Sequence, residues 1–372
     1  LAFLSGHELS RLEEKNRFYL QVSINAKQEL QVSFSGIIHQ AILNLLSITK
    51  NPCKLNGKTF NEDERIQLLV DGQQQSSLAI FYVIKLMLYY RFHQNAAFEQ
   101  SNQLAKQYID ALAGTHWVSI FNFYDSLSRL ANYSNSSDEK QTDILAAVDT
   151  NQQQMQYWAK HAPMNFQHKW ELVEAERCRI IDTDMSITLA HYENAIQGAH
   201  DHEYIQEEAL ANELTARFFL ENNNTTIAKI YITNAYYAYA NWGAKAKTHD
   251  LEKRYPDLLA PVLRSTAVVS SSINTQSVTN VQTVELDLNS VLKCSRILSG
   301  ELSLSALLEK ILNIVMENAG AQRSIFILNQ NEQWSIAGLC EMDQHNRQIL
   351  PDILLKDFQK IPQTMINHVI NQ

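Results

Sequence analysis

The chain has 372 residues, with 31 Lys and Arg against 40 Asp and Glu, and it contains only 10 Gly and 6 Pro. Average proteins contain about 7 % Gly and 5 % Pro, so both are strongly depleted here. Sandwiches, barrels and doubly wound sheets need frequent turns built from these residues, so the composition favours a mainly helical protein. The glycines are also too widely spaced for G-x-G-x-x-G or G-x-x-x-x-G-K-[ST] phosphate loops.

The net charge of −9 would repel phosphate backbones, so we expect no nucleic-acid partner. No apolar run reaches the roughly 18 residues of a membrane helix, and no secretory signal is present, so we expect no membrane span. The four cysteines, at 53, 178, 294 and 340, form no C-x-x-C pair. This pattern predicts reduced thiols in a cytoplasmic protein. Because the chain starts with Leu1 and its first methionine is Met87, we interpret it as a fragment of a longer protein.

Helical spacing of apolar residues dominates from about 6 to 262. The clearest predicted helices cover 77–92, 96–112, 118–133, 139–160 and 166–181. Breaks of only a few residues between such helices require consecutive helices to lie antiparallel.

A weak internal repeat accompanies these helices. The segment 192–196 resembles 232–236, and Ala175 and Ala216 occupy similar places in the preceding helices. Expected helix starts near 77, 117, 165 and 204 follow the same interval. A period of about 40 residues with two helices per unit is typical of an antiparallel helical-hairpin solenoid of the tetratricopeptide kind. A non-repeating helical bundle is the alternative.

The helical pattern is expected to end at Pro256 and Pro261, because proline stops helix growth. Residues 266–284 carry no charge and are rich in Ser and Thr, which predicts a linker. Beyond it the sequence predicts two helices, an antiparallel hairpin and a helical or irregular end, which together form a truncated α+β domain. These elements cover 286–298, 304–315, strands 323–328 and 333–340 around a turn at 329–332, and 349–372. The predicted domains are therefore 1–262, a linker at 263–285, and 286–372.

Candidate chemical sites are few. His161, His168, Glu171 and Glu174 lie in one stretch, and a second His/acid cluster follows at 200–203. Metal binding at either is geometrically conceivable, whereas hydrogen bonding at helix ends explains the same residues. No nucleophile elbow or kinase motif occurs in the chain. We therefore assign no catalytic, cofactor-binding or metal-binding residue.

Two apolar features could form partner surfaces. Tyr236, Tyr239 and Trp242 belong to a dense aromatic run, which could be helical core or a concave peptide-binding face. Leu304, Leu308 and Ile311 lie on one face of a predicted helix. The helices within 286–319 could pair in a homodimer, or the same face could pack on the hairpin of its own domain.

Several stretches resemble one family of proteins, the large multidomain signalling kinases common in cyanobacteria. They include HAPMN (161–165), HKWELVEAER (168–177), EYIQEEALANEL (203–214), AYYAY (235–239), WGAKAK (242–247), LEKRYP (251–256), LDLNSVLK (286–293), SGE (299–301) and ENAGAQ (317–322). Those kinases join a Ser/Thr kinase, an AAA-type ATPase, a tetratricopeptide-like helical region, a GAF domain and a sensor histidine kinase.

The resemblance implies that this chain is the tetratricopeptide-like region followed by the N-terminal half of a GAF domain. Its implied function is non-catalytic interaction and signal relay in a two-component system, with protein partners and other domains of the same polypeptide. ATP would then be the cofactor of parent domains outside this chain. The alternative is a sensor that itself binds a small molecule in the GAF-like part, or a metal. No ligand residue is carried over, because about half of a GAF pocket is missing.

Overall fold

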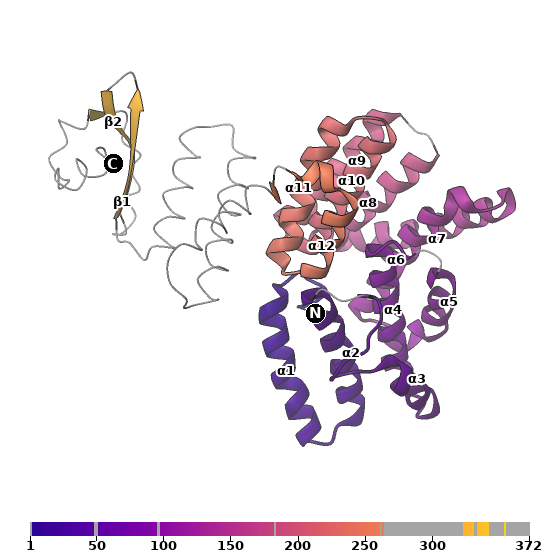
Figure 1. Ribbon diagram of the computed structural model, residues 1–372. Coiled ribbons are helices and arrows are strands. Elements are labelled where there is room, and N and C mark those ends of the chain that lie inside the picture. The colour runs from indigo at the N-terminus through magenta and orange to yellow at the C-terminus, as the bar shows by residue number, and fades with distance from the viewer. Residues whose placement is uncertain are drawn as a thin grey trace. The chain divides into compact units, whose positions relative to one another are not determined.

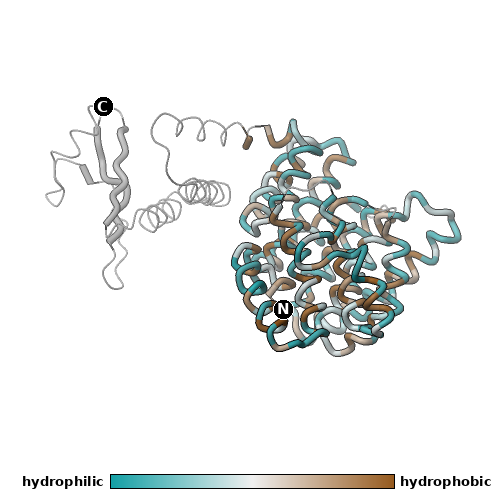
Figure 2. Tube along the Cα trace, turned by 60° about the horizontal axis from the view of Figure 1, so that its bottom comes forward, coloured by the Kyte–Doolittle hydropathy of each residue, from teal (hydrophilic) through white to brown (hydrophobic). Residues whose placement is uncertain are grey.

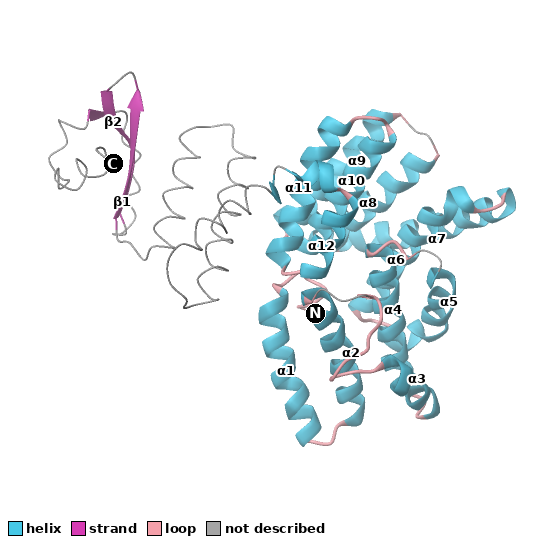
Figure 3. Ribbon diagram, in the orientation of Figure 1, coloured by secondary structure: helices cyan, strands magenta, loops and turns pink. Residues whose placement is uncertain are grey.

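The computed structural model describes residues 2–47, 51–94, 97–181, 184–260 and 262–263, and the backbone of three strands within 323–354. The chain divides into two compact units, Leu1–Val268 and Val269–Gln372. The first is mainly helical, with short loops joining the helices (Figures 1 and 3). The expected linker at 266–284 and the expected helices at 286–298 and 304–315 lie outside the described residues.

An inner layer of the helical unit is formed by alternate helices. They are α2 (Glu29–Leu46), α4 (Gln75–Arg91), α6 (His116–Asn132), α8 (Pro163–Ile180), α10 (Ile205–Glu221) and α12 (Lys245–Arg254). From α2 to α10 each of these helices packs against the next one in this series. The helices from α2 to α10 bury half or more of their residues, and α4 buries every residue from 77 to 88 except Tyr82. α12 buries Ala246, Lys247 and Leu251.

An outer layer covers them. Its helices are α1 (Leu9–Asn25), α5 (Phe98–Tyr108), α7 (Asp138–His161), α9 (Met185–Asp201) and α11 (Thr225–Trp242). Each is amphipathic, and α7 buries only a single stripe that includes Ile144, Val148 and Met155. The short helix α3 (Glu62–Asp71) packs on α4, and two 3₁₀ turns follow α5 and α6 at Ile109–Leu112 and Tyr133–Asn135. Apolar and polar residues accordingly alternate along most of the helical trace (Figure 2).

The predicted helical pairs and their interval are confirmed. The inner helices α4, α6, α8, α10 and α12 begin at Gln75, His116, Pro163, Ile205 and Lys245, about 40 residues apart. The small residues of the repeat, Ala175, Ala195, Ala216 and Ala235, are all buried where helices meet. Small side chains are favoured there because they let helix backbones approach closely.

The series of inner helices closes on itself. In a simple solenoid each repeat contacts only its neighbours, but here α12 packs against α2. The reversal into α12 occurs at Gly243, whose φ of 88° is a conformation that glycine adopts without strain. Phe3, near the start of the chain, stacks on Trp242 at the end of α11, with ring centroids 6.4 Å apart. The first and last helices of this unit therefore share one core.

The predicted helix stop needs a correction. α12 ends at Arg254, as the following proline predicts, but residues 256–260 are helical again. Proline fits the first turn of a helix, where its missing N–H needs no partner. Leu259 in this segment is fully buried, so the helical unit continues past Pro256.

The C-terminal unit contains a three-stranded antiparallel sheet of order β1-β2-β3. Its strands are β1 (Arg323–Gln330), β2 (Gln333–Glu341) and β3 (Ile353–Leu354). The predicted hairpin is confirmed, although β1 continues to Gln330 and so enters the expected turn at 329–332, whereas β2 begins at Gln333 as predicted. β3 corrects the expectation of helical or irregular structure there, because Ile353 and Leu354 add a third strand beside β2.

Candidate functional site

Charged side chains occupy the interior of the helical unit. Arg91, Lys169 and Lys247 are exposed by 2 % or less, and Glu176, Glu207 and Glu213 by 3 % or less. An unpaired buried charge costs several kcal/mol, so such groups must find partners. All of them except Arg91 do so in three clusters, which we name after their central carboxylates.

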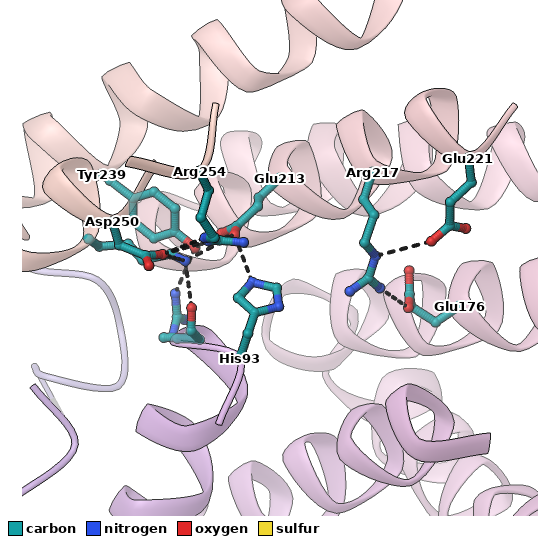
Figure 4. Close-up of polar contacts among 10 residues, drawn as sticks. His93, Glu176, Glu213, Arg217, Glu221, Tyr239, Asp250 and Arg254 are labelled. Atoms are coloured by element: carbon teal, nitrogen blue, oxygen red, sulfur yellow. Dashed lines mark hydrogen bonds and ion pairs between the residues drawn. The ribbon is translucent and has the colours of Figure 1, made fainter. Parts of the chain in front are cut away.

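The Glu213 cluster joins three inner helices (Figure 4). It consists of His93, Glu213, Tyr239, Lys247, Asp250 and Arg254. Glu213 Oε1 accepts from Lys247 Nζ at 2.9 Å and from Arg254 Nη2 at 2.7 Å. Its other oxygen accepts from the Tyr239 hydroxyl at 2.9 Å. One carboxylate of α10 therefore binds two cations of α12 and a hydroxyl of α11.

The same cluster reaches the end of α4. Lys247 Nζ donates to the backbone carbonyl of Arg91, the last residue of α4. Carbonyls at a helix C-terminus carry partial negative charge, so an ammonium group is favoured there. His93, just beyond α4, contacts Glu213 Oε1 at 3.2 Å. Residues far apart in the sequence are thus fixed to one another where the inner helices close.

Arg91 itself is buried among neutral groups. Its Nε donates to the Tyr124 hydroxyl at 3.0 Å, and its Nη1 donates to the Gln206 carbonyl at 3.0 Å. The rings of Tyr124, Tyr239 and Trp242 lie 5.8, 6.0 and 5.4 Å from the guanidinium carbon. Cation–π attraction is strengthened when the cation is desolvated. Tyr239 and Trp242, two members of the aromatic run found in the sequence, therefore pack around a buried cation.

The protonation states of the Glu213 cluster follow from burial and neighbouring charge. Burial alone would raise the pKa of Glu213, but Lys247, His93 and Arg254 outweigh it and hold this pKa well below its usual value. Burial lowers the pKa of Lys247 despite the nearby carboxylate. Burial likewise lowers the pKa of His93 from its ordinary 6.5, against the opposing effect of Glu213. At neutral pH Glu213 is charged and His93 is neutral.

The Glu176 cluster joins neighbouring helices of the repeat, α8, α9 and α10. Figure 4 shows its contact between Glu176 and Arg217. Glu176 Oε2 contacts Arg179 Nη2 at 2.9 Å and Arg217 Nη2 at 2.6 Å. Its other oxygen accepts from the Tyr192 hydroxyl, and Arg179 also reaches Glu221 at 2.9 Å. Burial opposes ionisation of Glu176, but the two arginines lower its pKa to about 2.

The Glu207 cluster ties the start of α10 to α8. Glu207 Oε2 contacts Lys169 Nζ at 2.8 Å and also contacts His168 Nε2. Lys169 donates to the Asn165 carbonyl at 2.8 Å, and its ammonium lies 4.2 Å from the centre of the Tyr204 ring. Burial would raise the pKa of Glu207, but Lys169 and His168 lower it to about 2. Burial, reinforced by Lys169, lowers the pKa of His168.

The three charged clusters are better suited to holding helices in place than to proton transfer. Glu176 and Glu207, with pKa values of about 2, are poor proton-transfer groups at neutral pH. Burial raises the pKa of the Tyr192 and Tyr239 hydroxyls well above 10. Within the described ranges, no group of three or more His, Cys, Asp or Glu side chains could hold a metal ion.

The first His/acid cluster of the sequence is divided among different neighbours. Its members do not bind one another in the structure; Glu207 contacts His168, His191 contacts Glu171 at 2.6 Å, and Gln152 donates to Glu174 at 2.8 Å. His161, at the end of α7, packs edge-on to Tyr157. In the second cluster, at 200–203, His200 lies on helix α9 and contacts Glu208 at 3.2 Å. The histidines and carboxylates of both clusters therefore form hydrogen bonds with neighbouring helices, which was the alternative to metal binding.

The aromatic partner surface needs correction. Tyr239 and Trp242 are exposed by 0 % and 1 %, so they form core and no concave binding face. Tyr236 is partly buried and donates to Glu252 at 2.9 Å. The second predicted surface, Leu304, Leu308 and Ile311, lies outside the described residues and stays a prediction.

Sequence reasoning missed the buried charges. Two of them appear as charges inside mainly apolar stretches, Glu213 within ALANELTARFF (209–219) and Arg91 at the end of an aromatic run, whereas Glu176, Glu207 and Lys247 stand near other charged residues. Such a pattern indicates a buried ion but does not identify its partner, because partners can lie far apart in the sequence. His93 and Glu213, for example, are more than 100 residues apart.

Comparisons with known proteins find one short similarity. A 61-residue stretch is 39 % identical to hybrid signal transduction histidine kinase G of Dictyostelium discoideum, which amounts to 16 % of this chain and 2 % of that protein. No protein-family model and no solved structure matches the chain. Among the described helices, none combines the length and apolar character that crossing a bilayer requires.

Proposed function

We propose that this chain is an interaction and signal-relay segment of a large multidomain signalling kinase, and that it performs no catalysis itself. The observation that carries the proposal is the similarity to a protein whose name is hybrid signal transduction histidine kinase. The closed, mainly helical first unit supports a scaffold role, because its buried charges fix helices in place and are unsuited to proton transfer.

The helical unit can relay a displacement because its ends are coupled. α12 precedes the chain that leads to the C-terminal unit, and Lys247 on α12 binds both Glu213 of α10 and the end of α4. A movement of α12 would therefore have to move or break these contacts. Rigid elements connected through packed and hydrogen-bonded groups are the physical basis of such coupling.

For the C-terminal unit we propose the first part of a GAF-like α+β domain, preceded by helices that pair in a homodimer. The antiparallel sheet β1-β2-β3 is compatible with this assignment. The dimer seam would contain Leu304, Leu308 and Ile311, whose spacing places them on one helical face.

Two measurements test the proposed function. Sedimentation of the L308D/I311D variant should show loss of the dimer, while N313D, a charge placed off this face, should leave it intact. A monomeric wild-type chain, or a variant that dimerises equally well, would contradict the seam. The purified chain should not hydrolyse ATP; turnover by the chain alone would overturn the relay proposal.

A further inference from the structure

The outward side of α1 carries exposed apolar side chains. Phe18, Tyr19 and Val22 are exposed by 64 %, 61 % and 48 %, and the rings of Phe18 and Tyr19 contact each other with centroids 5.5 Å apart. Single exposed apolar residues are common on protein surfaces, but contiguous ones mark interaction sites. The surface formed by Glu14, Phe18, Val22 and Asn25 is therefore a candidate docking surface, and we call it the α1 face.

Packing within the helical unit leaves this face open. α1 buries Leu9, Leu12 and Leu20 on its other side and packs mainly against α2. In Figure 1, α1 forms an edge of the helical unit, with α2 on one side of it and no other described helix of that unit on the opposite side. Residues 24–31, which connect α1 to α2, are all exposed. The α1 face is thus open to solvent from Glu14 to the loop that follows α1.

The charges of this face complement a reversed copy of itself. Glu14 lies one turn before Phe18, Val22 lies one turn after it, and Lys27 lies in the loop beyond α1. Two antiparallel copies of α1 can be placed so that Phe18 of each is level with Val22 of the other. Glu14 of each copy is then level with residues 26 and 27 of the other, so the exposed Lys27 can pair with it. A two-fold dimer would contain two such ion pairs.

Other arrangements of two copies lack this match. In a parallel pair Glu14 would face Glu14 and Lys27 would face Lys27, so like charges would repel. In the antiparallel pair Lys15 is level with Asn25, and no like charges meet there. An anionic membrane would require a basic surface, whereas this face carries charges of both signs.

The size of the α1 face indicates a weak contact. Phe18 and Tyr19 each expose on the order of 100–150 Å², given that a buried aromatic side chain covers about 150–250 Å². Together with Val22 and the charged residues they fall below the roughly 800 Å² per partner of a standard interface. We expect a dissociation constant of about 0.1 mM for isolated chains. Two chains that are joined elsewhere would form the contact at a high effective concentration.

We propose that the α1 face is a self-association surface, on which α1 pairs antiparallel with α1 of a second copy of this chain. Phe18 of each copy packs on Val22 of the other, and Glu14 of each pairs with Lys27 of the other. The contact goes beyond the relay function, whose proposed seam lies at 304–311 in the other unit.

Sedimentation of the full chain carrying L308D/I311D tests the contact without a contribution from that seam. At about 5 µM this variant should be monomeric, and at about 0.3 mM it should be mostly dimeric through the α1 face. A chain that stays monomeric at the higher concentration would overturn the α1 contact and leave the seam proposal untouched.

An exchange of charges tests the register. In the same background K27E should weaken the dimer at least threefold, because two pairs of carboxylates then meet, and E14K should do the same with two pairs of ammonium groups. The double variant E14K/K27E restores opposite charges and should bring the dissociation constant back to within about twofold. A double variant as weak as either single one would overturn the antiparallel pairing.

A matched pair of apolar variants tests the centre of the face. F18S/V22S should abolish dimerisation at about 0.3 mM. I187S/I230S also removes two exposed apolar side chains, from α9 and α11, where Ile187 and Ile230 are exposed by 48 % and 57 %, and it should leave the dimer unchanged. Circular dichroism confirms that each variant is folded. Equal dimerisation of the two variants would contradict the assignment of the α1 face.

Discussion

The Glu213 and Glu176 clusters have similar chemistry but different places in the fold. Each has a fully buried carboxylate that binds two cations and a tyrosine hydroxyl. The Glu176 cluster connects α8, α9 and α10, which are neighbours in the repeat. The Glu213 cluster connects the end of α4 with α10 and α12, which are distant in the sequence. The first reinforces local stacking; the second closes the structure.

This difference separates two sources of order in a helical repeat. Nearest-neighbour contacts would form in any array of helical hairpins. Closure requires α12 to meet α2 and α4, and its buried ions hold their positions only if every partner is present. We therefore expect the two clusters to respond differently to substitution.

The largest effect is expected for Glu213→Ala. It would leave Lys247, whose side chain is 1 % exposed, and Arg254 to share one remaining carboxylate, Asp250. Breaking a buried pair in this way costs about 3–5 kcal/mol of unfolding free energy. Urea unfolding monitored by circular dichroism measures it. A loss no greater than that of a surface substitution would show that Glu213 does not organise the closure.

Glu176→Ala should cost less, about 1–3 kcal/mol. Its partners Arg179 and Arg217 have side chains that are 16 % and 22 % exposed, so they can turn toward water when the carboxylate is removed. The same urea experiment compares the two variants directly. If Glu176→Ala were the more destabilising of the two, the proposed difference between the clusters would be wrong.

A smaller effect is expected from pH. The pKa of His93 is lower in the folded chain than its ordinary 6.5, so the unfolded chain binds a proton more readily. Stability from this group is present above pH 6.5 and is lost as the pH falls below it. Thermal unfolding of H93Q should depend less on pH between 5 and 7 than wild type. Burial also lowers the pKa of His168, so part of the pH dependence of stability should remain in H93Q. A pH profile identical to that of wild type would show that His93 does not contribute to it.

The smallest effect is expected at the surface. Arg11 contacts Glu8 at 3.0 Å, but its side chain is 82 % exposed. Water screens such pairs, so Arg11→Ala should leave the urea midpoint unchanged within error. This variant serves as the control for the two core carboxylates. A clear fall in its urea midpoint would contradict the claim that buried ion pairs contribute more to stability than exposed ones.

The local architecture was predictable because it depends on neighbouring residues. Apolar spacing identified helices such as α4, and the 40-residue interval placed the starts of α6, α8 and α10 within a few residues. The hairpin of β1 and β2 followed from strand composition. Closure was not predictable, because the partners of Glu213 lie on α11, on α12 and just beyond α4, and no local pattern encodes their meeting. Tyr239 and Trp242 were candidates for a partner surface for the same reason, since the distant residues that bury them cannot be identified from the local sequence.

The closed core is tested most directly by native-state hydrogen exchange on α2 and α12, in wild type and in Glu213→Ala. We predict that both helices are strongly protected in wild type and that both lose protection together in the variant, because the cluster fixes α12 and α12 packs against α2. If α12 exchanged rapidly in wild type while α2 stayed protected, the helical unit would be an open array and the account of its closure would be contradicted.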